Sequence, residues 1–171
     1  LTDLFYLGYE ILGLKEAKDR STGRRLVDPV YHKWLCDVLT TDKDIMVIVP
    51  RRHMKTTWIK IKLFQNVLKN PFIRQAMYSS TSTLVEQELA SIKRMFQTPL
   101  LMGLFPDVIP DPGKKGTGWQ TNRAGELTLY RNPEEGAAPQ ECQIEVYGAG
   151  ATVTGKHFDV HIYDDLINEK T

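Results

Sequence analysis

The sequence predicts an α/β fold in which a mostly parallel sheet is flanked by helices. Residues 45–49 are five apolar residues in a row, which is typical of a strand buried on both faces of a parallel sheet. A helical pattern follows at residues 56–68, and a second strand and helix follow at residues 74–96. The order strand, helix, strand, helix is typical of βαβ units.

The composition is that of an ordinary globular protein. The chain has 171 residues, enough for one domain, of which 42% are hydrophobic and 25% are charged. The net charge of +1 excludes an overall basic field of the kind that attracts nucleic acid. Residues 51–74 nevertheless contain seven Lys and Arg and no Asp or Glu, for which a solvated helix face is one sufficient interpretation.

Neither membrane insertion nor disulfide bonding is expected. No apolar run approaches the roughly 18 residues that a membrane helix needs, and the start of the chain does not resemble a secretory signal. Cys36 and Cys142 lack metal-ligand spacing, so we expect two reduced thiols in a cytoplasmic protein. Because the chain starts at Leu1 and ends directly after a candidate motif, we expect a fragment of a longer protein.

The N-terminal part predicts weak helical structure, a turn-rich stretch at residues 21–29 and then a short helix. Residues 1–29 form an N-terminal segment with weak helical periodicity at its start. Residues 30–39 follow a proline and place apolar side chains at helical spacing, which predicts a short helix. Tyr31 and Trp34 on this helix have two interpretations. We prefer packing in the core, and the alternative is stacking against an adenine base.

The first strand–helix pair is bounded by prolines. Pro50 ends the predicted strand at residues 45–49, because proline cannot donate to a sheet ladder. The helix predicted at residues 56–68 carries Ile59, Leu63 and Phe64 on one side. Asn70 and Pro71 end it.

The second strand–helix pair has a helix-start signal. Residues 74–80 predict the strand, and Thr83 with Glu86 predicts a capping box at the start of the next helix. Apolar residues at helical spacing give this helix one buried face. They are Val85, Leu89, Ile92 and Phe96.

The rest of the chain predicts loops and three further strands. Residues 100–125 hold many Gly and Pro and predict loops around short pieces of structure. Alternating or apolar-rich runs predict strands at residues 126–131, 141–147 and 158–166. Tight turns are expected at three glycines that precede the last strand, Gly148, Gly150 and Gly155.

The loop after the first predicted strand ends like a phosphate-binding loop. In such a loop, backbone N–H groups at a helix N-terminus face the phosphates, a lysine reaches the β and γ phosphates, and a hydroxyl ligates Mg²⁺. Lys55 and Thr56 fit the end of the pattern G-x-x-x-x-G-K-[ST], but both glycines are replaced, the second by Met54. Met54 must accept the backbone that this position needs, at about 1–3 kcal/mol if that backbone is strained. Charge-assisted hydrogen bonds from Arg51 and Arg52 to phosphate would offset the cost.

Two aspartates, Asp164 and Asp165, end the last predicted strand. Nucleotide hydrolases commonly place one acid at such a strand end to hold Mg²⁺, and a second beside it to polarise the attacking water. An isolated Asp-Asp pair usually marks only a turn. Together with the Lys55-Thr56 loop, however, the pair predicts a P-loop nucleotide hydrolase.

The sequence resembles the ATPase domain of large terminase subunits of tailed bacteriophages, over roughly residues 30–168. The resemblance lies in the segments YHKWLCDVL, VPRRHMKTT, MYSSTSTLVEQELASIKRMF and GAGATVTGKHFDVHIYDDL. It implies a P-loop NTPase fold of the additional-strand, catalytic-acid type, truncated after the Walker B strand. It also implies a motor in which a ring of subunits at the capsid portal hydrolyses ATP and drives double-stranded DNA inward.

The resemblance also implies roles for single residues. Lys55 matches the phosphate lysine, Thr56 the Mg²⁺ hydroxyl, Arg51 an arginine that senses phosphate, and Asp164 the Mg²⁺-associated acid. The whole nucleotide-binding loop is expected to comprise Pro50, Arg51, Arg52, His53, Met54, Lys55, Thr56 and Thr57.

Two positions depart from the family pattern. Met54 stands where a small residue is usual, and Asp165 stands where a glutamate often acts as the catalytic base. Because aspartate is one methylene shorter, it reaches less far or works through a second water. We prefer Asp165 as the base and keep Glu169 as the alternative.

The resemblance implies ATP and Mg²⁺ as cofactors. It implies these partners: double-stranded DNA, the portal protein and procapsid, the small terminase subunit and further copies of the chain in a ring. The expected location is the host-cell cytoplasm, with no membrane partner. Residues 30–171 would form a partial ATPase domain. The coupling motif and a nuclease domain would follow it, and the nuclease domain would make the full protein an endonuclease as well. A sheet that lacks later strands predicts an exposed edge or apolar patch.

Two other functions stay open at this point. The first is a helicase-like or other nucleic-acid-dependent ATPase with the same strands. The second is a non-catalytic nucleotide-binding remnant, in which Met54 marks a lost site.

Overall fold

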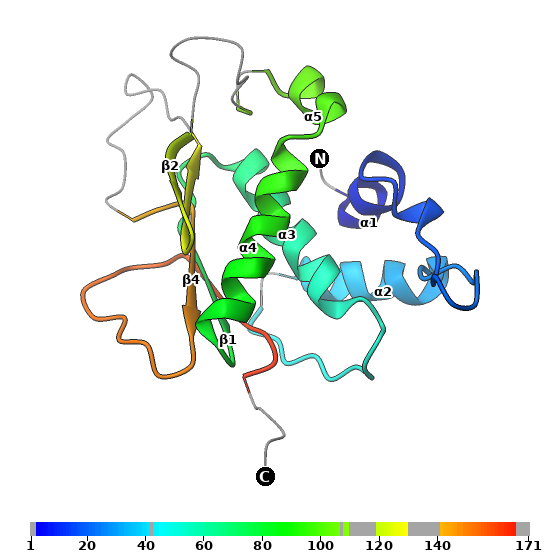
Figure 1. Ribbon diagram of the computed structural model, residues 1–171, viewed down its shortest axis with the longest axis horizontal. Helices are drawn as coiled ribbons and strands as arrows, with labels where there is room; N and C mark the ends of the chain where they lie inside the picture. The colour runs from blue at the N-terminus through cyan, green and yellow to red at the C-terminus, as the bar shows by residue number, and fades with distance from the viewer. Residues whose placement is uncertain (1–2, 42, 107, 110–118, 130–140, 167–171) are drawn as a thin grey trace. The chain divides into compact units, whose positions relative to one another are not determined.

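The computed structural model describes residues 3–41, 43–106, 108–109, 119–129 and 141–166 (Figure 1). The chain forms two compact units, Leu1–Gln65 and Asn66–Thr171, and their boundary falls within helix α3 (Lys55–Lys69). None of the helices in these ranges is long and apolar enough to cross a membrane. The domain boundary predicted after residue 29 stays a prediction.

The described part of the first unit is built from helices. It contains α1 (Leu4–Tyr6), the π-helical turn η1 (Leu7–Ile11), the 3₁₀ turn η2 (Leu14–Glu16), α2 (Pro29–Leu39) and the start of α3. Asp28 caps α2, because its carboxylate accepts the backbone N–H groups of Val30 and Tyr31 at 2.9 Å each. Pro29 occupies the first helical position, where its missing N–H costs nothing. The helix predicted at residues 30–39 is therefore confirmed.

The strand predicted at residues 45–49 is wrong. This segment has no regular secondary structure, and Met46 and Ile48 are 88% and 83% exposed. The described strands all belong to one sheet, which does not include this segment. An apolar run indicates that a strand is possible, but the strand forms only where a partner completes its hydrogen-bond ladder.

The second unit contains a mixed five-stranded sheet. Its elements are the end of α3, β1 (Gln75–Ser79), α4 (Ser82–Phe96), α5 (Pro99–Leu104), β2 (Trp119–Arg123), β3 (Glu126–Leu129), β4 (Ile144–Gly148) and β5 (Val160–Tyr163). The strand order is β2-β3-β4-β1-β5, and α4 packs along β4 and β1 (Figure 1). The α/β class is therefore confirmed.

The prediction of a mostly parallel sheet is wrong. Strands β4 and β5 both pair with β1 in parallel, but the β2–β3 and β3–β4 pairs are antiparallel. Only two residues, Ala124 and Gly125, connect β2 to β3, and so short a connection joins antiparallel strands only. Strand β2 lies in a region for which loops were predicted.

The other predicted strands agree with β1, β3, β4 and β5 to within a few residues, except that residues 130 and 131 lie outside the described ranges. Strand β5 forms one edge of the described sheet, and Tyr163 is 62% exposed. The expectation that this edge would pack against later strands stays a prediction.

Helix α4 confirms its predicted apolar face but not its predicted cap. The four apolar residues at helical spacing are all 0% exposed. The N-cap is Thr81, whose hydroxyl accepts the Leu84 N–H at 3.2 Å, so the capping box predicted at Thr83 and Glu86 is wrong. Thr81 is the last residue with extended backbone, and the helix therefore begins earlier than the Thr–Glu spacing indicated.

Candidate functional site

The loop that leads into α3 adopts a backbone rarely seen outside glycine. Arg52 has φ +68° and Met54 has φ +54°, so both lie in the left-handed region. For residues with a Cβ this region costs roughly 1–2 kcal/mol each. Met54 holds the position of the second glycine of a phosphate-binding loop, and it does adopt the glycine-like conformation. The left-handed backbone of Met54 is the strained case that the sequence left open.

Helix α3 begins at Lys55, directly after this loop. The Trp58 N–H donates to the Met54 carbonyl oxygen at 3.0 Å. The first N–H groups of an α-helix have no acceptor within the helix, and the helix dipole favours an anion at that end. Arg51 and Arg52 are exposed, whereas Lys55 is half-buried in the first turn. The predicted phosphate-binding residues therefore share one helix start.

Helix α2 contacts the loop through His32, which the sequence did not single out. His32 is 2% exposed, and its Nε2 lies 3.3 Å from the carbonyl oxygen of His53. The His53 ring lies 5.4 Å from the Tyr31 ring, and its Nδ1 lies 2.9 Å from the Arg51 carbonyl oxygen. The available signal was the spacing of His32 with Leu35, which places both on the buried face of α2.

Trp34 does not belong to the core, so the preferred interpretation of this residue is wrong. Its side chain is 52% exposed, because the buried face of α2 consists of His32, Leu35 and Cys36. The Tyr31 and Trp34 rings lie 5.9 Å apart. Stacking of an adenine on these rings stays a prediction.

The predicted acidic residues follow β5. Asp164 is 3% exposed, and its backbone N–H donates to the Tyr78 carbonyl oxygen at 2.9 Å, which extends the parallel ladder by one bond. Asp165 is exposed and has φ +46°, a left-handed conformation that ends the strand. Strands β1, β4 and β5 are parallel, so Asp164 lies at their common carboxyl edge, where ligands of α/β sheets usually bind. Glu169 lies outside the described residues.

An ion pair between an exposed lysine and a buried glutamate connects the glycine-rich turn before β5 to β4. Lys156 pairs with Glu145 of β4, whose side chain is 4% exposed, and the Tyr147 hydroxyl donates to the same carboxylate oxygen. Burial alone would lower the pKa of Lys156, but its hydrogen bonds to Glu145 and Tyr147 outweigh burial and raise it. Burial and the Glu145 carboxylate raise the pKa of Tyr147 to about 12. Lys156 therefore stays charged and holds the turn to β4.

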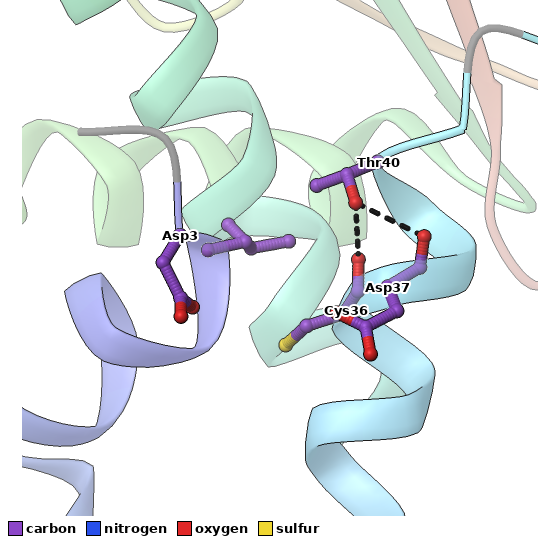
Figure 2. A pocket seen from close by; sticks show the side chains of 5 residues that line it. Asp3, Cys36, Asp37 and Thr40 are labelled. Carbon is purple, nitrogen blue, oxygen red and sulfur yellow. Dashed lines mark hydrogen bonds between the residues drawn. The ribbon is translucent and has the colours of Figure 1, made fainter.

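The described residues also line a hollow of about 240 Å³ that is open to solvent, in the first unit (Figure 2). Asp3, Leu4, Cys36, Asp37 and Thr40 line it. Burial raises the pKa of Cys36 to about 12, so this thiol is neutral and a poor nucleophile. No residue of the predicted nucleotide-binding loop lines the hollow.

The loop and the acids belong to different units. The first unit brings together residues 50–57 and His32, and the second unit holds Asp164 and Asp165. The joint binding of one nucleotide by Lys55 and Asp164 stays a prediction. Within the described ranges, no three His, Cys, Asp or Glu side chains form a metal-binding group.

Comparison with known proteins found no match among protein-family models, curated proteins or solved structures. The functional argument therefore rests on the residues and their geometry.

Proposed function

We propose that this chain is the ATP-hydrolysing domain of a DNA-packaging motor of the large-terminase type. The observation that carries the proposal is the left-handed backbone of Met54, directly before Lys55 at the start of α3. A non-glycine residue in this conformation costs free energy, and such strain concentrates at functional sites. It occurs here at the position where a phosphate-binding loop needs a glycine-like backbone.

The phosphates would bind at the N-terminus of α3. Left-handed and right-handed residues in alternation turn successive backbone N–H groups toward one concave point, which favours an anion. Lys55 would contact the β and γ phosphates, and Arg51 and Arg52 would bind phosphate oxygens through charge-assisted hydrogen bonds. This interpretation also gives a function to the segment of residues 51–74 that lacks acidic residues.

The chemistry of the side chains fits Mg²⁺. Thr56 and Asp164 offer hard oxygen ligands, and Mg²⁺ typically takes only one or two carboxylates, with phosphates and water as its other ligands. When bound with ATP, the ion neutralises charge that develops on the transferred phosphoryl group. Asp165 would orient the attacking water, with Glu169 as the alternative base.

The proposed role in DNA packaging rests on the resemblance to large terminase subunits. Double-stranded DNA, the portal protein and procapsid, the small terminase subunit and a ring of further copies are the partners in this proposal. An arginine from a neighbouring copy would complete the charge stabilisation of the transition state.

Mg²⁺-dependent ATP hydrolysis by the 171-residue chain, with and without double-stranded DNA, tests the proposal. Lys55→Ala is expected to reduce turnover at least about a hundredfold, because catalysis of phosphoryl transfer is mainly positioning and charge stabilisation. Lys69→Ala is the matched control, because it removes an exposed cation from the last turn of the same helix. Wild-type turnover by Lys55→Ala would exclude this site.

Binding measurements separate the alternatives. Tight binding of Mg·ATP without turnover, alone or with DNA, that persists at chain concentrations high enough for copies to assemble would identify a non-catalytic remnant. Turnover stimulated by single strands and coupled to strand separation would instead identify a helicase-like ATPase. For a hydrolase, Asp165→Asn is expected to keep ATP binding and to lose turnover.

A further inference from the structure

His32 is a buried polar residue whose role the proposed function does not explain. Its Nε2 lies 3.3 Å from the carbonyl oxygen of His53. His53 is the residue between Arg52 and Met54, the two positions with left-handed backbone in this loop. The side chain of His32 is therefore directed at the strained part of the loop.

The hydrogen-bond partners of His32 determine which ring nitrogen carries the proton. A carbonyl oxygen only accepts, so Nε2 must donate to His53. Nδ1 lies 2.9 Å from both the backbone nitrogen and the carbonyl oxygen of Asp28, and in the neutral ring it accepts the Asp28 N–H. The Nε2–H tautomer thus connects the N-cap residue of α2 to the loop.

Neighbouring rings hold the imidazole in this orientation. The His32 ring packs edge-on against Tyr31 at 5.0 Å and lies 5.9 Å from the ring of Trp58, in the first turn of α3. Trp58 is 0% exposed. Because these contacts restrict rotation of the ring, the donor at Nε2 is preorganised toward His53 before any ligand binds.

We propose that His32 is a positioning residue that holds the candidate phosphate loop in its binding conformation, an inference that rests on the proposed function. Without a constraint, Arg52 and Met54 would populate the lower-energy conformations with negative φ. The apparent dissociation constant rises as the fraction of molecules in the competent conformation falls. His32 therefore acts on nucleotide affinity through the backbone of His53.

Two substitutions separate the hydrogen bond from the packing. His32→Gln keeps an N–H donor, whereas His32→Met fills a similar volume without a donor. By isothermal titration with ATP and Mg²⁺, we expect His32→Met to bind about fivefold more weakly than wild type, the equivalent of one net hydrogen bond, and His32→Gln to recover most of the affinity. His157→Met, at an exposed histidine, is the control and is expected to bind as wild type.

A double-mutant cycle tests the mechanism. Glycine at position 54 adopts the left-handed backbone without a Cβ penalty, so the effect of His32→Met is expected to shrink in a Met54→Gly background. A purely structural role would lower the urea midpoint of His32→Met without coupling to position 54. Equal affinity of wild type, His32→Met and His32→Gln would overturn the inference and leave the proposed function intact.

Failure of the proposed function has a different signature. Absence of ATP binding by the wild type would overturn both the proposed function and this inference. If the His32 variants fail to fold, the wild-type tautomer still tests the geometry, because long-range ¹⁵N NMR must show the proton on Nε2. A proton on Nδ1 alone would overturn the inference.

Discussion

Replacement of Gly148 by alanine tests the packing at the carboxyl end of the sheet. A Cβ on Gly148 would lie 2.5 Å from the backbone nitrogen of Ser82, 2.6 Å from Ser82 Oγ and 3.0 Å from the carbonyl carbon of Thr81. An ordinary contact begins near 3.4 Å, so β4 and the start of α4 would have to separate by close to 1 Å. Two of the three atoms are backbone, which has no alternative rotamer.

The loss in free energy of unfolding comes from the contacts that this separation of β4 and α4 disturbs. The Thr81 hydroxyl caps α4, and the Ser79 carbonyl oxygen accepts the Ala149 N–H at 2.8 Å beside the last register pair of β1 and β4. Overpacking costs about 1–3 kcal/mol and a lost cap adds about 1 kcal/mol. Alanine has less conformational entropy than glycine in the unfolded chain, and this offsets about 0.4–1 kcal/mol of the loss. Together these terms predict a loss of about 1 to 3.5 kcal/mol, with a midpoint a little above 2 kcal/mol.

Urea unfolding followed by circular dichroism measures this loss. Gly103→Ala is the matched control, because no atom lies within 4 Å of its added Cβ and alanine favours the helix by about 1 kcal/mol. Gly150→Ala isolates backbone strain, since Gly150 has φ +83° and an unobstructed Cβ position. A loss below about 0.5 kcal/mol for Gly148→Ala would refute the close approach of β4 and α4.

Two further predictions concern the exposed apolar segment and an ion pair. Double substitution of Met46 and Ile48 by serine is expected to change the free energy of unfolding by less than about 0.5 kcal/mol, because both side chains are exposed. A loss above about 2 kcal/mol in urea unfolding would mean that the segment is buried as a strand. Arg74 donates to both carboxylate oxygens of Asp159 at 2.6 and 3.1 Å, and this hydrogen bonding lowers the pKa of Asp159. Asp159→Asn is therefore expected to cost up to about 1 kcal/mol at pH 7, a modest value because solvent screens the half-exposed pair. Folding lowers the pKa of the Asp159 carboxylate. The stabilisation is therefore fully present above the pKa of Asp159 in the unfolded chain, about 3.9, and it is lost as the pH falls through the lower pKa of Asp159 in the folded chain. An Asp159→Asn effect that persists undiminished at pH 2 would contradict the ion-pair explanation.

Local signals in the sequence located the helix after the candidate loop and the strand that ends at the two aspartates, but they misplaced a strand before the loop. The position of α3, which was predicted at residues 56–68 and begins one residue earlier, and the buried face of α4 follow from side-chain spacing, because the 3.6-residue period is a property of the helix itself. The strain at Met54 was also foreseeable, since the motif alone shows where a glycine is missing. Helices and their termini depend mainly on neighbours within a few residues, and a sequence displays those neighbours directly.

Strand partners and buried polar contacts could not be foreseen in the same way. The apolar run at residues 45–49 has the composition of a buried strand, yet it is exposed because no ladder includes it. His32 meets His53 across 21 residues of chain, and no spacing rule indicates that pair. Likewise, the antiparallel β3–β4 pairing joins segments separated by residues 130–143.

By itself, the sequence determined the α/β class, the positions of α2, α3 and α4, and the placement of Lys55, Thr56, Asp164 and Asp165 at the ends of elements. Only the tertiary structure decided the mixed strand order, the exposure of Trp34 and the contact of His32 with the loop. The physical reason is the range of the interactions. Helical periodicity and turn chemistry act between residues close in sequence, whereas ladder pairing and burial depend on which distant segments fold against one another.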